Sequence, residues 1–175
     1  MVEDFSNSGI KLSLIGSSQS GKSSILSRFL NHCFSDSYKP TIGVEFQFKQ
    51  IPWKGKSLSI QAWDTSGDAS WRSMTLSNYI HTQGFLIVYS LNDRNSFEEA
   101  KIFISLFKSR ANNLAYAVLI GNKCDLKSER QVSYEEGKQL ADENEILYLE
   151  TSAKNGINVH FSIKTLCETV ILLCK

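Results

Sequence analysis

The sequence predicts a single α/β domain built on a mostly parallel sheet. Helical and strand patterns alternate along almost the whole chain, which is typical of this class. Two continuous apolar runs, Phe85 to Tyr89 and Tyr116 to Ile120, suit central strands that are buried on both faces. The 175 residues are enough for one hydrophobic core and show no repeat or linker. We therefore expect one domain over residues 1–175, with a flexible N-terminus at residues 1–9.

The chain begins with a predicted strand, a glycine-containing loop and a helix. The apolar run from Leu12 to Ile15 predicts the strand, and residues 24–30 carry apolar side chains at helical spacing. Residues 34–43 are rich in turn formers and lack periodicity. They predict a long loop, and loops of this length are often functional.

An antiparallel hairpin is predicted next. Residues 44–51 and 58–63 are strand-like and are joined by a short link across residues 52–56. So short a link permits only antiparallel pairing, because parallel strands need a longer crossover. A second polar loop, residues 64–70, leads into a weakly patterned helix that ends near Tyr79.

The second half of the chain supplies further helices and one more strand. Ser133 and Glu136 have the spacing of a capping box that opens a helix. Residues 146–149 form the last predicted strand. Apolar positions at helical spacing predict two more helix faces: Phe97, Ala100, Ile104 and Phe107 in one, and Val159, Ile163, Leu166, Val170 and Ile171 in the other.

Composition excludes several classes of protein. A net charge of +1 without a basic stripe argues against nucleic acid as a partner. The acidic, polar start is no secretory signal, and no apolar run approaches the length that spans a membrane. The four cysteines are scattered without metal-ligand spacing, which suits a reduced cytoplasmic protein. The ending at Cys174 is not a C-a-a-X prenylation signal.

The loop from Gly16 to Ser23 matches the phosphate-binding pattern G-x-x-x-x-G-K-S/T, between the strand and the helix that the pattern requires. Its glycines let backbone N–H groups curve around an anion, and the following helix adds its partial positive charge. Lys22 supplies a full charge for the outer phosphates, and the Ser23 hydroxyl can ligate Mg²⁺. The alternative is an ordinary glycine turn that ends in Lys-Ser.

Two stretches that follow strands suit a guanine base. The Asp125 carboxylate can accept two hydrogen bonds from the N1 and N2 edge of guanine, which adenine lacks. Asn122 can join neighbouring loops, and the stem of Lys123 can lie along the ring. Backbone N–H groups of residues 150–154 could meet the guanine O6. By itself each stretch could also be an ordinary polar turn.

Asp64 and Gly67 lie at the end of the second hairpin strand. An Asp at this place suits an indirect Mg²⁺ partner, and a glycine N–H can approach the γ-phosphate closely. Both could equally be turn residues.

With these motifs in order, the chain resembles the Ras superfamily of small GTPases, most closely its Rab branch, from Lys11 to Cys174. The residues 41–46, 63–65 and 87–89 carry the resemblance to Rabs. The resemblance implies a three-layer P-loop GTPase fold with a six-stranded sheet, five helices and two switch segments, Phe34 to Gly43 and Asp64 to Tyr79.

The resemblance also assigns roles to single residues. Phe34 matches the aromatic residue that packs against guanine, and Tyr38 the one that covers the phosphates. Thr41 and Ser23 match the Mg²⁺ ligands, and Asp64 holds a metal-bound water. The predicted GTP or GDP contacts are Gly16, Ser18, Gln19, Ser20, Gly21, Lys22, Ser23, Ser24, Phe34, Tyr38, Thr41, Gly67, Asn122, Lys123, Asp125, Ser152, Ala153 and Lys154.

Several residues depart from the family's pattern. Asp68 stands where small GTPases usually have the Gln that orients the attacking water. Its carboxylate could act as a base, but repulsion from the phosphates favours slow hydrolysis. Gln19 replaces a small residue and either points to solvent or reaches the phosphates in place of the missing Gln.

Three further departures concern partners. Ala69 and Ser70 replace a Glu-Arg pair, and Asn78 replaces the third ring of an aromatic triad with Phe46 and Trp63. Trp71 could extend this apolar patch or belong to the core.

The resemblance implies a monomeric, Mg²⁺-dependent GTPase switch of vesicle traffic, with catalysis by Lys22, Gly67 and Asp68 and a speculative part for Gln19. Effectors, exchange factors and GTPase-activating proteins would bind through Phe34 to Phe46 and Asp64 to Tyr79, without nucleic acid. Membrane attachment, on the cytosolic face of endomembranes, would need a lipidated tail. A non-hydrolysing binding module is the alternative, and a P-loop kinase or ATPase is disfavoured by Asn122 to Asp125.

Overall fold

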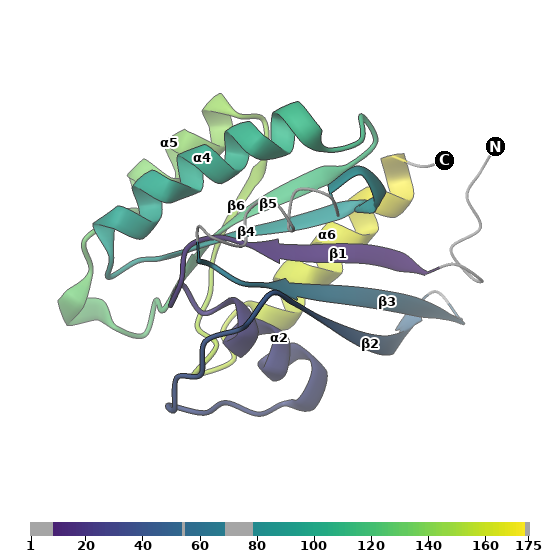
Figure 1. Cartoon of the computed structure of the whole chain (residues 1–175), viewed down its shortest axis with the longest axis horizontal. Helices are drawn as coiled ribbons and strands as arrows, with labels where there is room; N and C mark the ends of the chain where they lie inside the picture. Colours follow the sequence, from purple (N-terminus) through teal and green to yellow (C-terminus); the bar gives the residue numbers. More distant parts are fainter. Residues whose placement is uncertain (1–8, 54, 69–78, 174–175) are drawn as a thin grey trace.

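The computed structural model describes residues 9–53, 55–68 and 79–173 (Figure 1). Its strands and α-helices in chain order are β1 (Ile10–Ile15), α2 (Lys22–Asn31), β2 (Val44–Trp53), β3 (Lys56–Thr65), β4 (Gly84–Ser90), α4 (Arg94–Arg110), β5 (Tyr116–Asn122), α5 (Tyr134–Glu143), β6 (Leu147–Glu150) and α6 (Val159–Leu173). Two 3₁₀ turns, η2 (Tyr79–His81) and η3 (Lys127–Glu129), complete the described elements. The predicted α/β class and the order of its elements are confirmed.

Six strands form one sheet in the order β2-β3-β1-β4-β5-β6. β2 pairs antiparallel with β3 at the edge, and every other neighbouring pair is parallel. The predicted hairpin is therefore confirmed, but both of its strands are longer than expected. Pro52 pairs with Ser57 within the ladder, which an edge strand tolerates because the proline has no N–H to donate. β3 runs on to Thr65, so Asp64 lies in the strand and not in the loop that follows it.

Helices cover both faces of the sheet. α2 and α6 pack on one face, around a buried cluster that includes Leu12, Leu26 and Ile163. α4 and α5 pack on the other, around a cluster that includes Phe85, Phe97 and Leu140. Figure 1 shows α4 and α5 on the opposite side of the sheet from α2 and α6. The three layers follow from strands that are apolar on both faces.

Four α-helices lie in the described part of the chain, one fewer than predicted. The helix expected to end near Tyr79 falls on residues 69–78, outside the described residues. The predicted capping box is confirmed at the start of α5, where Ser133 and Glu136 exchange backbone and side-chain hydrogen bonds. Within the described residues, no helix is both long and apolar enough to cross a bilayer.

Parallel pairing places the carboxyl ends of β1, β3, β4, β5 and β6 along the same edge of the sheet. The loops that leave this edge carry the motifs that the sequence singles out. Ligands of open α/β sheets usually bind in the crevice outside these strand ends. The topology therefore brings together motifs that are more than a hundred residues apart in the sequence.

Candidate functional site

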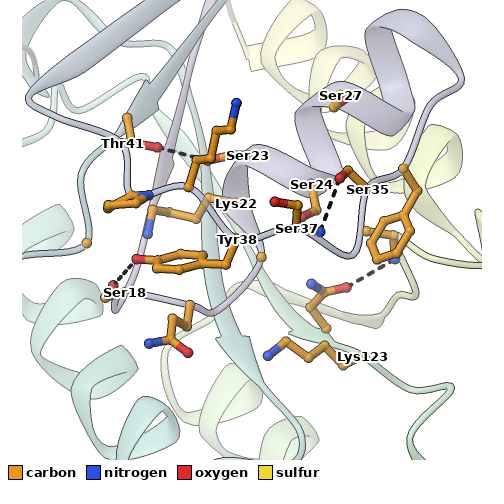
Figure 2. A pocket seen from close by; sticks show the side chains of 18 of the residues that line it. Ser18, Lys22, Ser23, Ser24, Ser27, Ser35, Ser37, Tyr38, Thr41 and Lys123 are labelled. Atoms are coloured by element: carbon orange, nitrogen blue, oxygen red, sulfur yellow. Dashed lines mark hydrogen bonds between the residues drawn. The ribbon is translucent and has the colours of Figure 1, made fainter.

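One cavity of about 850 Å³ opens at this edge of the sheet (Figure 2). Its walls come from the loop after β1, the start of α2, the long loop before β2, and the loops after β3, β5 and β6. Most of the predicted nucleotide contacts line it. They are Ser18, Gln19, Gly21, Lys22, Ser23, Ser24, Phe34, Tyr38, Thr41, Gly67, Asn122, Lys123, Asp125, Ala153 and Lys154.

Three predicted contacts, Gly16, Ser20 and Ser152, do not line the cavity. The carbonyl of Gly16 accepts a hydrogen bond from Lys22 behind the wall. The Ser20 side chain is fully buried and donates to the carbonyl of Ser17 at 2.9 Å. Ser152 is also fully buried, and its hydroxyl donates to Asp125 at 2.5 Å. The structure gives these residues a supporting place instead of direct exposure to the cavity.

Lys22 folds back over the phosphate-binding loop. Its Nζ donates to the carbonyls of Gly16 at 3.0 Å and Ser17 at 2.8 Å, and only 5% of the residue is exposed. Burial lowers the pKa of Lys22 to about 8, although the nearby Asp64 carboxylate opposes the shift. The ammonium group is therefore mostly charged at pH 7, and a bound phosphate would relieve its burial. This geometry holds a positive charge ready at the loop.

The loop also contains a residue in a conformation that side chains seldom adopt. Gln19 has a φ of 60°, in the left-handed region, and its exposed side chain lines the cavity. Such a conformation costs of order 1 kcal/mol for a residue other than glycine. Lys123, at the base end of the cavity, has a similar φ of 66°.

Three oxygen-bearing side chains converge beside the phosphate-binding loop. The Ser23 hydroxyl donates to the Asp64 carboxylate at 2.5 Å and lies 3.0 Å from the Thr41 hydroxyl. Thr41 donates to the same Asp64 oxygen, Oδ2, at 3.3 Å. Figure 2 shows Thr41 and Ser23 side by side at one end of the cavity. These three residues lie in separate segments of the sequence, and the fold brings them together.

The second oxygen of Asp64 identifies what this cluster suits. Oδ1 is buried and has no hydrogen-bond partner among the described residues, and the residue is only 2% exposed. Burial raises the pKa of Asp64, and the hydrogen bonds from Ser23 and Thr41 partly oppose that shift. A buried carboxylate oxygen that lacks a partner costs folding free energy unless a cation is near. Because Mg²⁺ prefers a few protein oxygens beside water and phosphate, the residues present fit this ion.

The loop of residues 34–43 lies over the cavity. The hydroxyl groups of Tyr38 and Ser18 are 3.0 Å apart, and Figure 2 shows the Tyr38 ring crossing the cavity towards Ser18. Near the other end of the loop, Asp36 lies 3.4 Å from the ammonium group of Lys154. No helix or strand forms in residues 33–43, as predicted. The loop therefore contacts both the phosphate-binding loop and the loop after β6.

Asn122, the last residue of β5, joins the phosphate-binding loop to the loop after β6 at the other end of the cavity. Its amide donates to the carbonyl of Ser20 at 2.9 Å and accepts from the Thr151 hydroxyl at 3.1 Å and the Ala153 N–H at 3.3 Å. Its Nδ2 atom would lie 2.2 Å from a Cβ on Gly21, where φ is 95°. Only glycine therefore fits there. The predicted role of Asn122 in tying a guanine base to the neighbouring loops stays a prediction.

The residues that depart from the family's pattern are partly described. Asp68 is exposed, lines the cavity, and its N–H donates to the Ser66 hydroxyl at 3.3 Å. The Phe46 and Trp63 rings meet at 5.0 Å, and Phe46 is 51% exposed. Predictions for Ala69, Ser70, Trp71 and Asn78 lie outside the described residues.

The cavity also includes residues that the sequence motifs did not reveal. They are Ser27, Ser35, Asp36, Ser37, Lys39, Pro40, Ile42, Thr65, Ser66 and Leu126. Most belong to the long loop before β2, where the path of the chain and not a motif sets each position. The turn-forming composition and the resemblance predicted a loop and a switch segment here, but neither said which side chains face the cavity.

Comparisons with known proteins agree with this arrangement. A sequence model of the Ras family matches residues 11–172. The chain is 40% identical over 161 residues to the GTP-binding protein ypt2 of Schizosaccharomyces pombe, covering 92% of this chain and 80% of that protein. It is 42% identical over 156 residues to the Ras-related protein RIC1 of Oryza sativa subsp. japonica, covering 89% and 77%. It is 41% identical over 150 residues to the Ras-related protein Rab-8B of Dictyostelium discoideum, covering 86% and 74%.

Proposed function

Because this chain belongs to the Ras family and is similar to its Rab and Ypt members, we propose that it is a guanine-nucleotide switch of vesicle traffic. It binds GTP and GDP together with Mg²⁺ and hydrolyses GTP. The observation that carries this proposal is that Lys22 and Asp125 line the same cavity. One end of the site then holds the phosphates, and the other reads the base.

Base selection rests on the Asp125 carboxylate. It accepts a hydrogen bond from the Ser152 hydroxyl at 2.5 Å, which directs the carboxylate and leaves further lone pairs for the base. Guanine offers N–H groups at N1 and N2 to such a carboxylate. Adenine has no such pair of N–H donors and would leave these further lone pairs of the carboxylate without partners, which disfavours ATP strongly. A kinase or ATPase is therefore the weaker interpretation of the phosphate-binding loop.

Phosphate binding rests on Lys22, the backbone of residues 16–21 and the start of α2. When Mg²⁺ is bound, it supplies positive charge that neutralises the developing charge on the phosphate oxygens. Ser23 and Thr41 are the residues that would ligate the ion, with Asp64 acting through a metal-bound water. Lys22 holds its ammonium group against the same phosphates.

The switch would come from residues 34–43 and 64–79. Thr41 is positioned beside Ser23, and Gly67 packs against the phosphate-binding loop, so both lie where an added γ-phosphate would be sensed. Ordering of two such segments by the γ-phosphate is a general way to turn hydrolysis into a change of surface. Effectors, exchange factors and GTPase-activating proteins would then bind along Phe34 to Phe46 and Asp64 to Tyr79, on the cytosolic face of endomembranes.

Hydrolysis is proposed to be slow. Asp68 carries a carboxylate where an amide would orient the attacking water, and a negative charge near the phosphates repels them. Gln19 lines the same cavity, carries the amide side chain of the phosphate-binding loop, and could partly replace the missing group. The second candidate function, a non-hydrolysing binding module, is favoured by the same Asp68.

Three measurements test these functions in turn. Chromatography of the nucleotide that copurifies with the protein should give GTP or GDP, and titration should show guanine nucleotides bound far more tightly than ATP. Single-turnover hydrolysis of GTP then separates a slow GTPase from a module that does not hydrolyse. A preference for ATP over GTP would overturn the proposed function.

A further inference from the structure

We propose that Arg28 of α2 is a positioning residue for guanine recognition, because it fixes the backbone group that reads the O6 atom of the base. Arg28 does not line the cavity and belongs to none of the nucleotide motifs. The inference deepens the proposed function and rests on it, since it concerns the specificity of the same site.

The Arg28 guanidinium binds two successive carbonyls of the loop after β6. Its Nε donates to the carbonyl of Ala153 at 2.8 Å, and its Nη2 donates to the carbonyl of Lys154 at 2.6 Å. Two parallel hydrogen bonds from a planar, charged fork fix direction as well as distance. These contacts join residues that are more than a hundred positions apart in the sequence.

A third hydrogen bond anchors the guanidinium to its own helix. Nη1 donates to the carbonyl of His32, the residue that caps α2, at 2.8 Å. The N–H of His32 in turn donates to the carbonyl of Arg28 at 3.1 Å. The same helix begins at Lys22, so Arg28 connects the phosphate end of the site rigidly to its base end.

The consequence for the base follows from peptide geometry. In a trans peptide the C=O and the N–H point in opposite directions, so holding the Ala153 carbonyl also directs the N–H of Lys154. This N–H has no acceptor among the described residues, and both residues of the peptide line the cavity. Because Arg28 holds the carbonyl side of this peptide and does not line the cavity, the Lys154 N–H points away from Arg28, and we expect it to face the space for the base.

A second peptide is held in the same way. The Lys154 carbonyl accepts from Arg28, and the following N–H, of Asn155, donates to the Ser152 hydroxyl at 3.0 Å. Ser152 donates in turn to Asp125. The path from Arg28 to Asp125 is longer than the path to Lys154, and Ser152 has its own anchor in a bridge to Ile157. The contact with O6 should therefore depend on Arg28 more strongly than the contact with the guanine 2-amino group.

The test compares three nucleotides that differ only in the base. GDP has both O6 and the 2-amino group, and inosine diphosphate lacks the 2-amino group. The diphosphate of 2-aminopurine riboside lacks O6 and with it the hydrogen on N1, so each variant is compared with the wild type for the same nucleotide. Dissociation constants are measured for the whole protein, for Arg28→Met and Arg28→Lys, and for the control Arg110→Met at the exposed end of α4.

In Arg28→Met the affinity for GDP and inosine diphosphate should fall about tenfold or more, which is the effect of losing hydrogen bonds from a charged donor. The affinity for the 2-aminopurine nucleotide should stay near that of the wild type. The variant should therefore lose its preference for nucleotides that carry O6, while the ratio of its affinities for GDP and inosine diphosphate should not change. Arg28→Lys, which keeps one charged donor, should lose less. The control should match the wild type.

Two results would overturn the inference: an unchanged preference for O6, or an equal loss for all three nucleotides, which would mean a general structural effect. Circular dichroism confirms that each variant is folded, and Arg28→Lys carries the test if Arg28→Met does not fold. Failure of the wild-type protein to prefer guanine nucleotides would instead overturn the proposed function, so the two failures are distinguishable.

Discussion

A side chain on Gly67 would collide with Ser18, because a Cβ atom there would lie 2.2 Å from the Ser18 backbone nitrogen. The loop after β3 therefore packs directly on the phosphate-binding loop. Because Ser18 and Gly67 both line the cavity, moving either backbone away from the other would change the wall of the cavity. The contact joins the phosphate-binding loop to one of the two segments that we propose to sense the γ-phosphate.

Replacing Gly67 by Ala should weaken the binding of GTP more than the binding of GDP. The added methyl pushes the two loops apart, and overpacking of this kind costs about 1–3 kcal/mol. Dissociation constants for GDP and a non-hydrolysable GTP analogue measure the effect. Gly55→Ala is the control for the ratio of the two affinities, because it adds the same methyl outside the cavity, where no atom lies within 4 Å; the strain of a side chain at its φ of 77° lowers stability only. Equal affinities for the triphosphate in Gly67→Ala and the wild type would contradict the prediction.

Replacing Asp68 by Gln should accelerate single-turnover hydrolysis of GTP about 10- to 100-fold, the usual effect of one well-placed donor in a transition state. Asp68→Asn is the matched variant, because it removes the charge but keeps the short side chain. Acceleration in both variants would make charge repulsion the cause. Acceleration in Asp68→Gln alone would mean that the length of the side chain, which lets its amide reach the attacking water, is the cause. If neither variant hydrolyses faster, Asp68 is not what limits the rate.

Replacing Gln19 by Gly should slow hydrolysis further if its amide partly replaces the missing Gln. The same change should raise the free energy of unfolding by about 1 kcal/mol, since glycine adopts the positive φ of this position without strain. Single-turnover kinetics and urea unfolding measure the two effects separately. An unchanged rate beside a raised stability would leave Gln19 with no catalytic part.

Replacing Asp64 by Asn should weaken Mg²⁺ binding about 10- to 100-fold, as is typical when an outer partner of a metal site is lost. Removing Mg²⁺ with EDTA should accelerate the release of GDP from the wild-type protein. The Mg²⁺ concentration that restores slow release should be higher in the variant. Asp36→Asn, a change on the exposed rim of the same cavity, is the control. Release that is insensitive to EDTA would argue against a metal at this cluster.

The start of α5 should lose stability in acid. A hydrogen bond from Arg94, together with the backbone N–H of Ser133, lowers the pKa of Glu136 from 4.5 to about 2. A carboxyl group whose pKa is lowered by folding stabilises the folded state above its unfolded pKa. That contribution is lost as the pH falls from about 4.5 to about 2.

Glu136→Gln tests this, because glutamine can keep the capping box while it removes the charge. The urea midpoint of the variant should be lower than that of the wild type at pH 6, and the difference should shrink towards pH 3. Glu135→Gln, on the same helix, is the control. A difference that does not depend on pH would assign the effect to packing.

Contiguous patterns predicted the parts of this fold whose cause is local. The phosphate-binding loop, the hairpin and the capping box at Ser133 each depend on residues that are close in the sequence, so spacing and residue type were sufficient. The hairpin strands are longer than predicted, because β2 continues through Pro52 and pairs with β3 as far as Lys56. An edge strand has no partner on one side, and that property belongs to the sheet.

By itself, then, the sequence determined the chemistry at hand: a lysine and a serine for phosphate and metal, a carboxylate for guanine, and an unusual Asp68. Only the tertiary structure decided which groups meet. Asp64, with its buried, unpartnered oxygen, is brought beside Ser23 from a distant part of the sequence. The hydrogen bond from Arg28 to the carbonyl of Ala153 likewise joins residues that are far apart in the sequence. These contacts form because the parallel sheet brings the ends of distant strands to one edge. At this edge, backbone groups that no sequence motif marks become hydrogen-bond partners.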